Sequence, residues 1–495
     1  MIDLDHISYW YPRRTEAALH DATLRIRDGE SLCIMGRNGS GKSTLVKLIA
    51  GLIRPDRGKI SVDGHAREGT PDTRVGILFQ NPDNQMVATL VEKELAFALE
   101  NRAMPQAEMV EEVSRAARQF GIEHLSRRLT SDLSGGEKQR VALASVMVQQ
   151  PAVLLLDEPD SFLDQAGRLI LSAELERLHT EDRRLIEIRI TQSAQVARQY
   201  ARLVVLDAGA VVADGDPAAL LADHRLCALA GLTVPDTSAM QVRIPRRVGN
   251  GQNAPAGSLT AVQMKDIAYN WPMSPDIFER LSAELNVGET VGLIGSTGAG
   301  KSTIGLLLAG LAAPSKGEVV YLDKTGWPLK LKDIRGEMAM VLQQPERQFF
   351  LDTCRHEVGF GPKNLGRPLG DDEIGEFLEL VGLYPARYIE RDPFSLSAGE
   401  KRRLAFATVL AMEPSIVVFD EPTAGLDGEG VGRFIALSHA LKSMKLGQLV
   451  ISHDGDVIQR LCDRVLYLTR RGKLLPLSVA ELFGDPRLSG MLSQG

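Results

Sequence analysis

Cysteine is scarce in this sequence, which has four among 495 residues: Cys33, Cys227, Cys354 and Cys462. No two of them are close enough along the chain to form a CxxC metal or redox motif, and so few exclude a disulfide framework. A reduced, cytosolic setting is therefore expected.

The sequence also lacks an apolar run long enough to cross a membrane, for which about 20 residues are needed. The longest candidate, 304–313, is interrupted by Gly305 and Gly310. Residues 1–8 have neither a basic start nor an apolar core, so we expect no secretory signal. If the protein serves a membrane, a separate partner is expected to span it.

Charge of one sign does not dominate, because 57 Lys and Arg stand against 64 Asp and Glu, a net charge of -7. This balance argues against a protein that coats nucleic acid or another polyanion. Hydrophobic residues make up 44% and charged residues 24%, which are ordinary globular values and exclude wholesale disorder. At about 150 residues per domain, the length indicates two or three folded units.

The sequence does contain a long internal repeat. GRNGSGKST at 36–44 recurs as GSTGAGKST at 295–303, an offset of 259 residues. LSGGEKQR from Leu133 recurs as LSAGEKRR from Leu396, and LLLDEPDSFLD recurs as VVFDEPTAGLD, both at an offset of 263. Because the offsets barely drift, we interpret the repeat as a tandem duplication of a whole domain.

A segment rich in Pro, Gly, Asn and Ser separates the two copies at 234–258 and has no sustained apolar period. Such a composition is typical of a surface linker. We expect the two domains to occupy 1–233 and 259–495.

Each copy follows the same pattern of apolar strands and helices. A short strand precedes each Gly-rich loop, and a second, continuously apolar strand follows later; we expect these strands at 31–35, 290–294, 153–156 and 416–419. Apolar strands that alternate with helices indicate a parallel sheet covered on both faces. The intervening stretches, about 85–135 and 348–397, predict a helical subdomain in each copy.

The P-loop motif, G-x-x-x-x-G-K-[ST], occurs in both copies, between a predicted strand and a predicted helix. Its glycines let backbone N–H groups surround phosphates, its Lys reaches the β- and γ-phosphates and its Ser ligates Mg²⁺. The expected nucleotide-binding residues are Gly36, Arg37, Asn38, Gly39, Ser40, Gly41, Lys42, Ser43 and Thr44, and Gly295, Ser296, Thr297, Gly298, Ala299, Gly300, Lys301, Ser302 and Thr303.

An acidic pair ends each later strand: Asp157-Glu158 and Asp420-Glu421. The pairs follow the P-loop lysines by 115 and 119 residues, so their positions match between the copies. We expect each Asp to hold Mg²⁺ and each Glu to polarise the attacking water.

In this order the motifs resemble the ATP-binding-cassette ATPase family, twice over and across nearly the whole chain. The resemblance implies an α/β fold of two P-loop NTPase domains, each with a mainly parallel sheet, an antiparallel β part and a helical subdomain. It also implies ATP and Mg²⁺ as ligands, with two cassettes closing head-to-tail so that each ATP lies between one P-loop and the other signature. The signature residues are then Ser134, Gly135, Gly136 and Glu137, and Ser397, Ala398, Gly399 and Glu400.

The same resemblance assigns further residues to the nucleotide sites. Gln80 and Gln343 match the Q-loop glutamines, which also contact Mg²⁺ and the transmembrane partner. Asp164 and Asp427 match the D-loop aspartates, and Tyr11 and Trp271 match the aromatic residue that stacks on adenine; a core or turn ring would explain either aromatic as well.

The segments around the Q-loops resemble one subfamily. FQNPDNQ at 79–85 and AFALEN at 96–101 resemble the first ATPase of energy-coupling-factor importers of vitamins and metals, and LQQPERQ with GFGPKN at 359–364 resembles the second. The chain is therefore similar to both ATPases fused into one motor, held at the cytoplasmic face of the cell membrane as a peripheral protein. The implied partners are a transmembrane coupling protein and a separate substrate-binding membrane protein, with no nucleic acid.

In that subfamily the coupling protein presents arginines beside the Q-loops. Asp83, Glu94, Glu346 and Glu357 are candidate acceptors, and a solvated helix face would explain each of them equally well.

Two other functions fit part of the sequence. The tandem ATPase of a monosaccharide importer has a similar length, but PDNQ, PERQ and GPKN argue against it. A soluble, ribosome-associated tandem cassette ATPase would resemble this chain less, because its linker is long, charged and helical.

The copies differ at two site positions. The second contains His453 in LVISHD, where the family contacts the γ-phosphate through a His, and the first has Gln192 in RITQSAQVA. The second signature has Ala398 where the first has Gly135. Under head-to-tail pairing both departures fall in the site on the first P-loop. We expect that site to be impaired and the site on the second P-loop to hydrolyse ATP.

Overall fold

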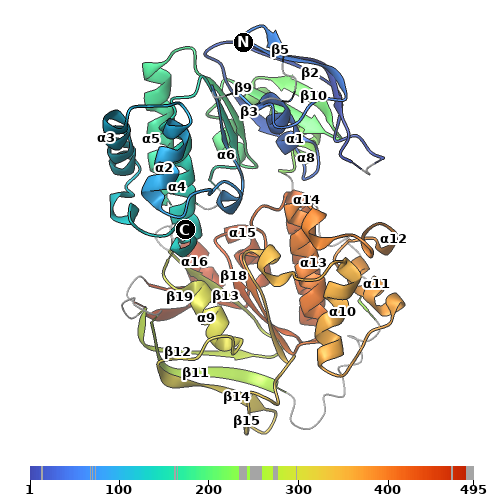
Figure 1. Ribbon diagram of the computed structural model, residues 1–495. Coiled ribbons are helices and arrows are strands. Elements are labelled where there is room, and N and C mark those ends of the chain that lie inside the picture. Colours follow the sequence, from blue (N-terminus) through green and yellow to red (C-terminus); the bar gives the residue numbers. More distant parts are fainter. Residues whose placement is uncertain are drawn as a thin grey trace. The chain divides into compact units, whose positions relative to one another are not determined.

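The computed structural model describes residues 1–12, 15–66, 69, 71–72, 74–160, 163, 165–232, 242, 244–245, 259–270, 277–296, 298–469 and 472–485. Three predicted site residues, Asp164, Trp271 and Thr297, lie outside the described residues, as does most of 234–258. The chain divides into two compact units, Met1–Thr233 and Val234–Gly495. Figure 1 shows their elements.

The first unit is built on a six-stranded sheet in the order β10-β9-β3-β8-β7-β6. All neighbours pair in parallel except β9 and β10. The strands are β3 (Ser31–Met35), β6 (Val75–Leu78), β7 (Val153–Asp157), β8 (Ile186–Ile190), β9 (Arg202–Asp207) and β10 (Ala210–Gly215). A separate antiparallel sheet, β2-β1-β4-β5, contains β1 (Ile2–Tyr9), β2 (Leu19–Ile26), β4 (Arg57–Val62) and β5 (His65–Ala66).

The second unit repeats this plan. Its six-stranded sheet has the order β16-β17-β18-β13-β19-β20, in which only β19 and β20 pair antiparallel. The strands are β13 (Thr290–Gly295), β16 (Met338–Val341), β17 (Ile416–Asp420), β18 (Gly447–Ile451), β19 (Arg464–Leu468) and β20 (Leu474–Ser478). The antiparallel sheet β12-β11-β14-β15 contains β11 (Leu259–Tyr269), β12 (Phe278–Asn286), β14 (Lys316–Asp323) and β15 (Pro328–Leu329).

Helices cover both faces of each parallel sheet. The first unit contains α1 (Lys42–Ile49), α2 (Val91–Glu100), α3 (Gln106–Gln119), α4 (Gly135–Met147), α5 (Gln165–Glu181), α6 (Ala194–Ala197), α7 (Pro217–Leu220) and α8 (His224–Leu229). The second contains α9 (Lys301–Leu308), α10 (Cys354–Asn364), α11 (Asp371–Leu380), α12 (Pro385–Tyr388), α13 (Ala398–Leu410), α14 (Gly428–Ser443), α15 (Gly455–Leu461) and α16 (Val479–Gly484). In the part of the chain that the structure describes, no helix is long and apolar enough to cross a membrane.

Burial on both faces explains why the central strands are apolar throughout. In β17, Ile416 and Val418 pack into one core cluster with α9, whereas Val417 and Phe419 pack into another with α13 and α14. Successive side chains of a strand point to opposite faces, so a strand covered on both sides has no position for a solvated residue. These runs predicted the strands closely, and the fold class is confirmed.

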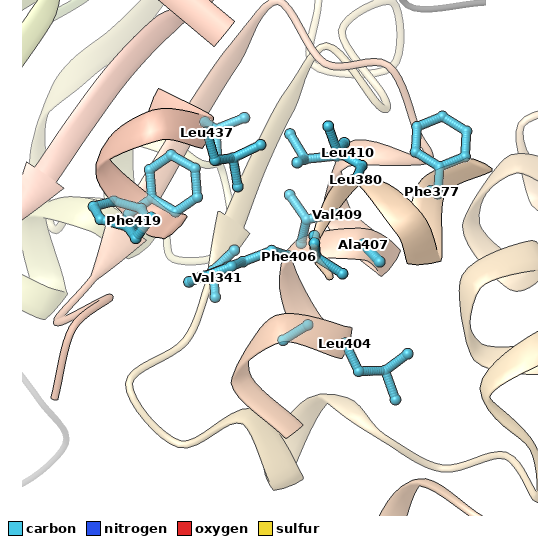
Figure 2. Packing of buried hydrophobic residues seen from close by; sticks show 14 of the residues in the cluster. Val341, Phe377, Leu380, Leu404, Phe406, Ala407, Val409, Leu410, Phe419 and Leu437 are labelled. Atoms are coloured by element: carbon cyan, nitrogen blue, oxygen red, sulfur yellow. The ribbon is translucent and has the colours of Figure 1, made fainter. Parts of the chain in front are cut away.

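An aromatic cluster in the second unit joins α13, the helix that begins in the signature segment, to the central sheet. Phe406 on α13 lies edge-on to Phe419 on β17 with ring centroids 5.7 Å apart, and Phe434 on α14 lies 5.2 Å from Phe419. Figure 2 shows Phe406 between Val341 and the other residues of α13. Because all three rings are almost fully buried, this packing fixes α13 against the strand that ends at Asp420.

Candidate functional site

Each P-loop leaves a central strand and turns directly into a helix, β3 into α1 and β13 into α9. Gly41 and Gly300 precede these helices, and both have φ of 101°. A Cβ on Gly41 would lie 2.5 Å from the Ala18 carbonyl oxygen, and one on Gly300 would lie 2.7 Å from Ile277 and Phe278. Only glycine fits this backbone and this space, which lets the helix N-terminal amides face the loop.

The two P-loop lysines lie buried inside their loops. Lys42 Nζ donates to the Gly36 carbonyl at 2.7 Å, and Lys301 Nζ donates to the Gly295 carbonyl at 2.8 Å. Burial lowers the pKa of Lys301, although Glu421 and Asp420 act against this shift. Each ammonium group is thus held beside the helix N-terminus, where a phosphate chain would bind.

The strand-end aspartates, which the sequence predicts as Mg²⁺ ligands, lie beside the P-loop serines. Asp157 and Asp420 are buried, each hydrogen-bonds the P-loop serine of its own unit, Ser43 or Ser302, and burial raises the pKa of both carboxyls. Asp420 Oδ1 is also buried without a hydrogen-bond partner among the described residues. A buried carboxylate oxygen of this kind requires a partner, and a hydroxyl and a carboxylate are ligands that Mg²⁺ prefers. The residues therefore fit Mg²⁺.

The glutamates that follow adopt an unusual backbone conformation. Glu158 and Glu421 both have φ of 48°, in the left-handed region that a non-glycine residue seldom occupies. Their N–H groups donate to the Ile190 and Ile451 carbonyls of the neighbouring strands, at 3.1 and 2.9 Å. Such a conformation costs about 1–3 kcal/mol and persists only where its surroundings hold it. The sheet thus turns each carboxylate out of the strand direction in the same way.

The partners of the two glutamates differ. Glu158 accepts from Gln80 Nε2 at 2.9 Å and from Gln192 Nε2 at 3.1 Å. Glu421 Oε1 instead lies 3.3 Å from His453 Nε2. Gln192 and His453 each lie two residues beyond the end of β8 or β18, strands that pair in the same register with β3 and β13. The two residues therefore occupy equivalent positions, with an amide in one site and an imidazole in the other.

Burial raises the pKa of Glu421 to about 7, against opposing effects of Lys301, the His453 backbone and Arg402. The folded protein therefore holds the proton of the Glu421 carboxyl more strongly than the unfolded chain does, because the ordinary pKa of this carboxyl is 4.5. The contribution of Glu421 to the free energy of unfolding must therefore fall as pH rises between these two values. Glu421→Gln is expected to raise the melting temperature by about 3 °C at pH 8, and the gain should shrink as pH approaches 4.5. Thermal unfolding across this pH range measures it, and a gain independent of pH would contradict the assignment.

Both signature segments begin a helix with a capping box. Ser134 and Ser397 cap α4 and α13 with nearly identical ψ of 161° and 162°, and Glu137 and Glu400 bond back to the cap backbone at 2.8 Å. These glutamates therefore hold the helix start. Ala398 leaves the backbone unchanged and adds an exposed methyl group at the first helical position. Its effect on a bound phosphate would be steric.

The remaining predicted site residues lie near these motifs. Tyr11 hydroxyl lies 3.3 Å from Thr44 Oγ1, which brings its ring beside the P-loop helix. Asp427 caps α14 by accepting from Gly430 N at 2.9 Å. Gln343 is exposed, and its backbone carbonyl accepts from Arg402.

The structure corrects the interpretation of two candidate acceptors for a partner's arginines. Glu94 is buried and accepts from the backbone N–H of Val87 and Ala88 at 2.9 and 2.7 Å, and Glu357 does the same in the second unit for Phe350 and Leu351. Both carboxylates shape the loop after the Q-loop. Tertiary packing brings these amides to the two carboxylates, and a single glutamate in the sequence does not indicate such packing.

Asp83 is likewise engaged within its own unit, since it forms an ion pair with Lys138 of the signature helix. Sequence reasoning also missed Arg402, whose guanidinium group contacts both the Q-loop and the loop at Glu421. The only indication of its role in the sequence was a difference between the two signature segments, where KQR in the first copy becomes KRR in the second.

Comparisons with known proteins identify the family. A family model described as "ABC transporter" matches residues 19–161 and 278–424. A protein of Bifidobacterium longum named "Putative ABC transporter ATP-binding protein" is 32% identical over 94% of this chain, which spans 64% of that relative's length. Bacillus subtilis "Putative HMP/thiamine import ATP-binding protein YkoD" is 29% identical over 98% of this chain and 93% of its own. Among solved structures, cbiO1 from Clostridium perfringens is 32% identical over 47% of this chain and 95% of its own, with a TM-score of 0.40.

The chain belongs to the ABC transporter family. It is a tandem ATP-binding protein of two cassettes that bind ATP with Mg²⁺, and its ATP hydrolysis is coupled to transport.

Proposed function

We propose that this chain is the motor of an energy-coupling-factor type importer. ATP binding closes the two cassettes head-to-tail, hydrolysis reopens them, and membrane partners convert the cycle into uptake of a vitamin precursor or a transition metal. The motor acts at the cytoplasmic face of the cell membrane as a peripheral protein. The Q-loop segments and the name of the Bacillus subtilis relative support this proposal.

An exposed aromatic pair beside the second Q-loop is the observation that carries the importer proposal. Phe350 follows the Q-loop segment Pro345–Gln348, Phe360 lies on α10, and their rings meet edge-to-face with centroids 4.8 Å apart. Both are exposed, by 60% and 40%. Val87 and Phe97 are exposed at the matching positions of the first cassette. Exposed aromatic residues are typical of a surface that another protein covers.

The coupling protein is the partner whose apolar helices would cover these pairs, and a further membrane protein would carry the substrate. Because the pairs follow the Q-loops, docking there would act on the loop that connects to the nucleotide site. A partner bound at these residues would therefore move the Q-loop of each cassette directly.

The double variant Phe350→Asp and Phe360→Asp is expected to abolish retention of membrane subunits when the chain is purified from detergent-solubilised membranes. Two buried charges at an apolar contact would cost the complex several kcal/mol. Mass spectrometry of the purified complex measures the loss. The matched control is Trp327→Asp, because Trp327 is 71% exposed between β14 and β15 and should tolerate the change. Equal retention in both variants, or isolation of the unmodified chain with ribosomes and no membrane subunit, would contradict the proposal.

The two sites are proposed to differ in catalysis. In the site on the second P-loop, Glu421 orients the attacking water and accepts its proton, and His453 lies beside it at 3.3 Å. Asp420 and Ser302 would hold Mg²⁺, which would supply charge neutralisation for the phosphates when bound. The site on the first P-loop combines Gln192 with Ala398 of the opposite signature, so it would hold ATP and hydrolyse it slowly.

The difference has a chemical reason. A glutamine amide donates hydrogen bonds but carries no charge, whereas an imidazole can become a cation at physiological pH. In addition, Glu158 is already bonded to two amides, from Gln80 and Gln192. These amides compete for the oxygen atoms that a catalytic base presents to water.

A further inference from the structure

One arginine of the second signature helix joins the two loops that meet at the nucleotide site. Arg402 Nη2 donates to the carbonyl of Gln343 in the Q-loop at 3.0 Å, and Nη1 donates to the carbonyl of Glu421. The Arg402 side chain is buried. A planar guanidinium group holds two acceptors in a fixed geometry, which a flexible ammonium group does not.

The surroundings explain why this charge is tolerated inside the protein. Burial lowers the pKa of Arg402 to about 10, and Glu421, Glu346 and Asp420 act in the opposite direction. The two backbone carbonyls accept hydrogen bonds from two of its five N–H groups. Four residues further along the same helix, Phe406 packs against Phe419 of β17 (Figure 2), which fixes the helix that carries Arg402.

In the first cassette these two contacts are divided between two neighbouring residues of α4, Gln139 and Lys138. Gln139, at the position equivalent to Arg402, is fully buried, and its Nε2 donates to the Pro159 carbonyl at 3.1 Å. Its amide oxygen has no hydrogen-bond partner among the described residues. The first Q-loop is tied to the signature helix by the Asp83–Lys138 ion pair instead. That ion pair ends on a Q-loop side chain and does not reach the loop at Glu158.

We propose that Arg402 is a positioning residue that locks the second Q-loop to the catalytic glutamate, so that a movement of the Q-loop moves Glu421. The assignment rests on the proposed activity of the second site. One rigid group makes both contacts, and Glu421 sits in a backbone conformation that needs support. Loss of the group would loosen the carboxylate without removing any contact to ATP.

Arg402→Gln, which installs the residue of the first cassette, tests this in the full-length chain. The kcat for ATP is expected to fall about tenfold, as for the loss of two charge-assisted hydrogen bonds that orient a reacting group, while KM stays within twofold. Arg402→Lys keeps the charge but not the fork and should recover only part of kcat. The pattern of unchanged KM and graded kcat separates positioning from a general loss of folded protein.

Arg403→Gln provides the matched control. Arg403 is the next residue of α13, and it donates to the Gly382 carbonyl at 3.1 Å, away from the Q-loop and Glu421. It should lower the melting temperature but leave kcat within twofold. A kcat unchanged in Arg402→Gln, or a fall equal to that in Arg403→Gln, would overturn the proposal.

The same variants are also measured with Glu158→Gln in place. Loss of ATPase in Glu158→Gln alone would contradict the proposed difference between the sites, whatever Arg402 does. The effect of Arg402→Gln in the otherwise unmodified chain then still decides the role of Arg402.

Discussion

Replacing Glu421 by Gln is expected to lower the ATPase rate of the full-length chain at least about a hundredfold, whereas Glu158→Gln should retain most of the rate. General-base catalysis typically contributes 10²–10⁴-fold, and the isosteric amide removes the base without removing volume. We expect this asymmetry because the neighbours differ: Glu421 lies beside an imidazole, and Glu158 is bonded to the amides of Gln80 and Gln192.

Phosphate release at saturating ATP measures both variants, on the full-length chain alone and with its membrane subunits. Nucleotide binding provides the control, because each variant should still bind ATP with Mg²⁺ through its P-loops. Equal losses in the two variants would contradict the asymmetry. So would a larger loss in Glu158→Gln, which would exchange the roles of the sites.

Much of the fold could be predicted, and most candidate site positions could be proposed, because their signals are local. Apolar strands such as 153–156 and 416–419 are continuous since both faces are covered. The P-loop glycines recur because only glycine fits beside Ala18 or Phe278. The difference between Gln192 and His453 was visible because a duplicated sequence supplies its own comparison.

The remaining features depend on long-range packing and could not be read from the sequence. The left-handed backbone of Glu158 and Glu421 is held by carbonyls of a neighbouring strand more than 25 residues away in the chain. Glu94 and Glu357 look like surface acceptors, yet the loop that precedes each helix buries them against its backbone amides. In each case the partner is a backbone atom, whose position no residue type indicates.

His453→Gln is expected to lower the ATPase rate about a hundredfold, because it gives the second site the residue of the first. Loss of one contact that stabilises the transition state typically costs 10²–10³ in rate. Gln192 shows that a glutamine fits this position in a cassette, since it bonds Glu158 and Asn38 at 3.1 Å each. The substitution should therefore preserve the fold, which thermal unfolding checks, while phosphate release measures the rate.

The reciprocal variant separates the two departures of the first site. With Glu421→Gln silencing the second site, Gln192→His alone should recover part of the rate, and Gln192→His with Ala398→Gly should recover more. The added gain is expected because the exposed methyl of Ala398 lies at the start of α13, where a phosphate would approach the helix amides. If Ala398→Gly adds nothing, the methyl is tolerated and the missing imidazole alone accounts for the impairment. If neither change restores hydrolysis, the bonds that Glu158 makes with Gln80 would be the stronger cause, and Gln192 would not determine the asymmetry.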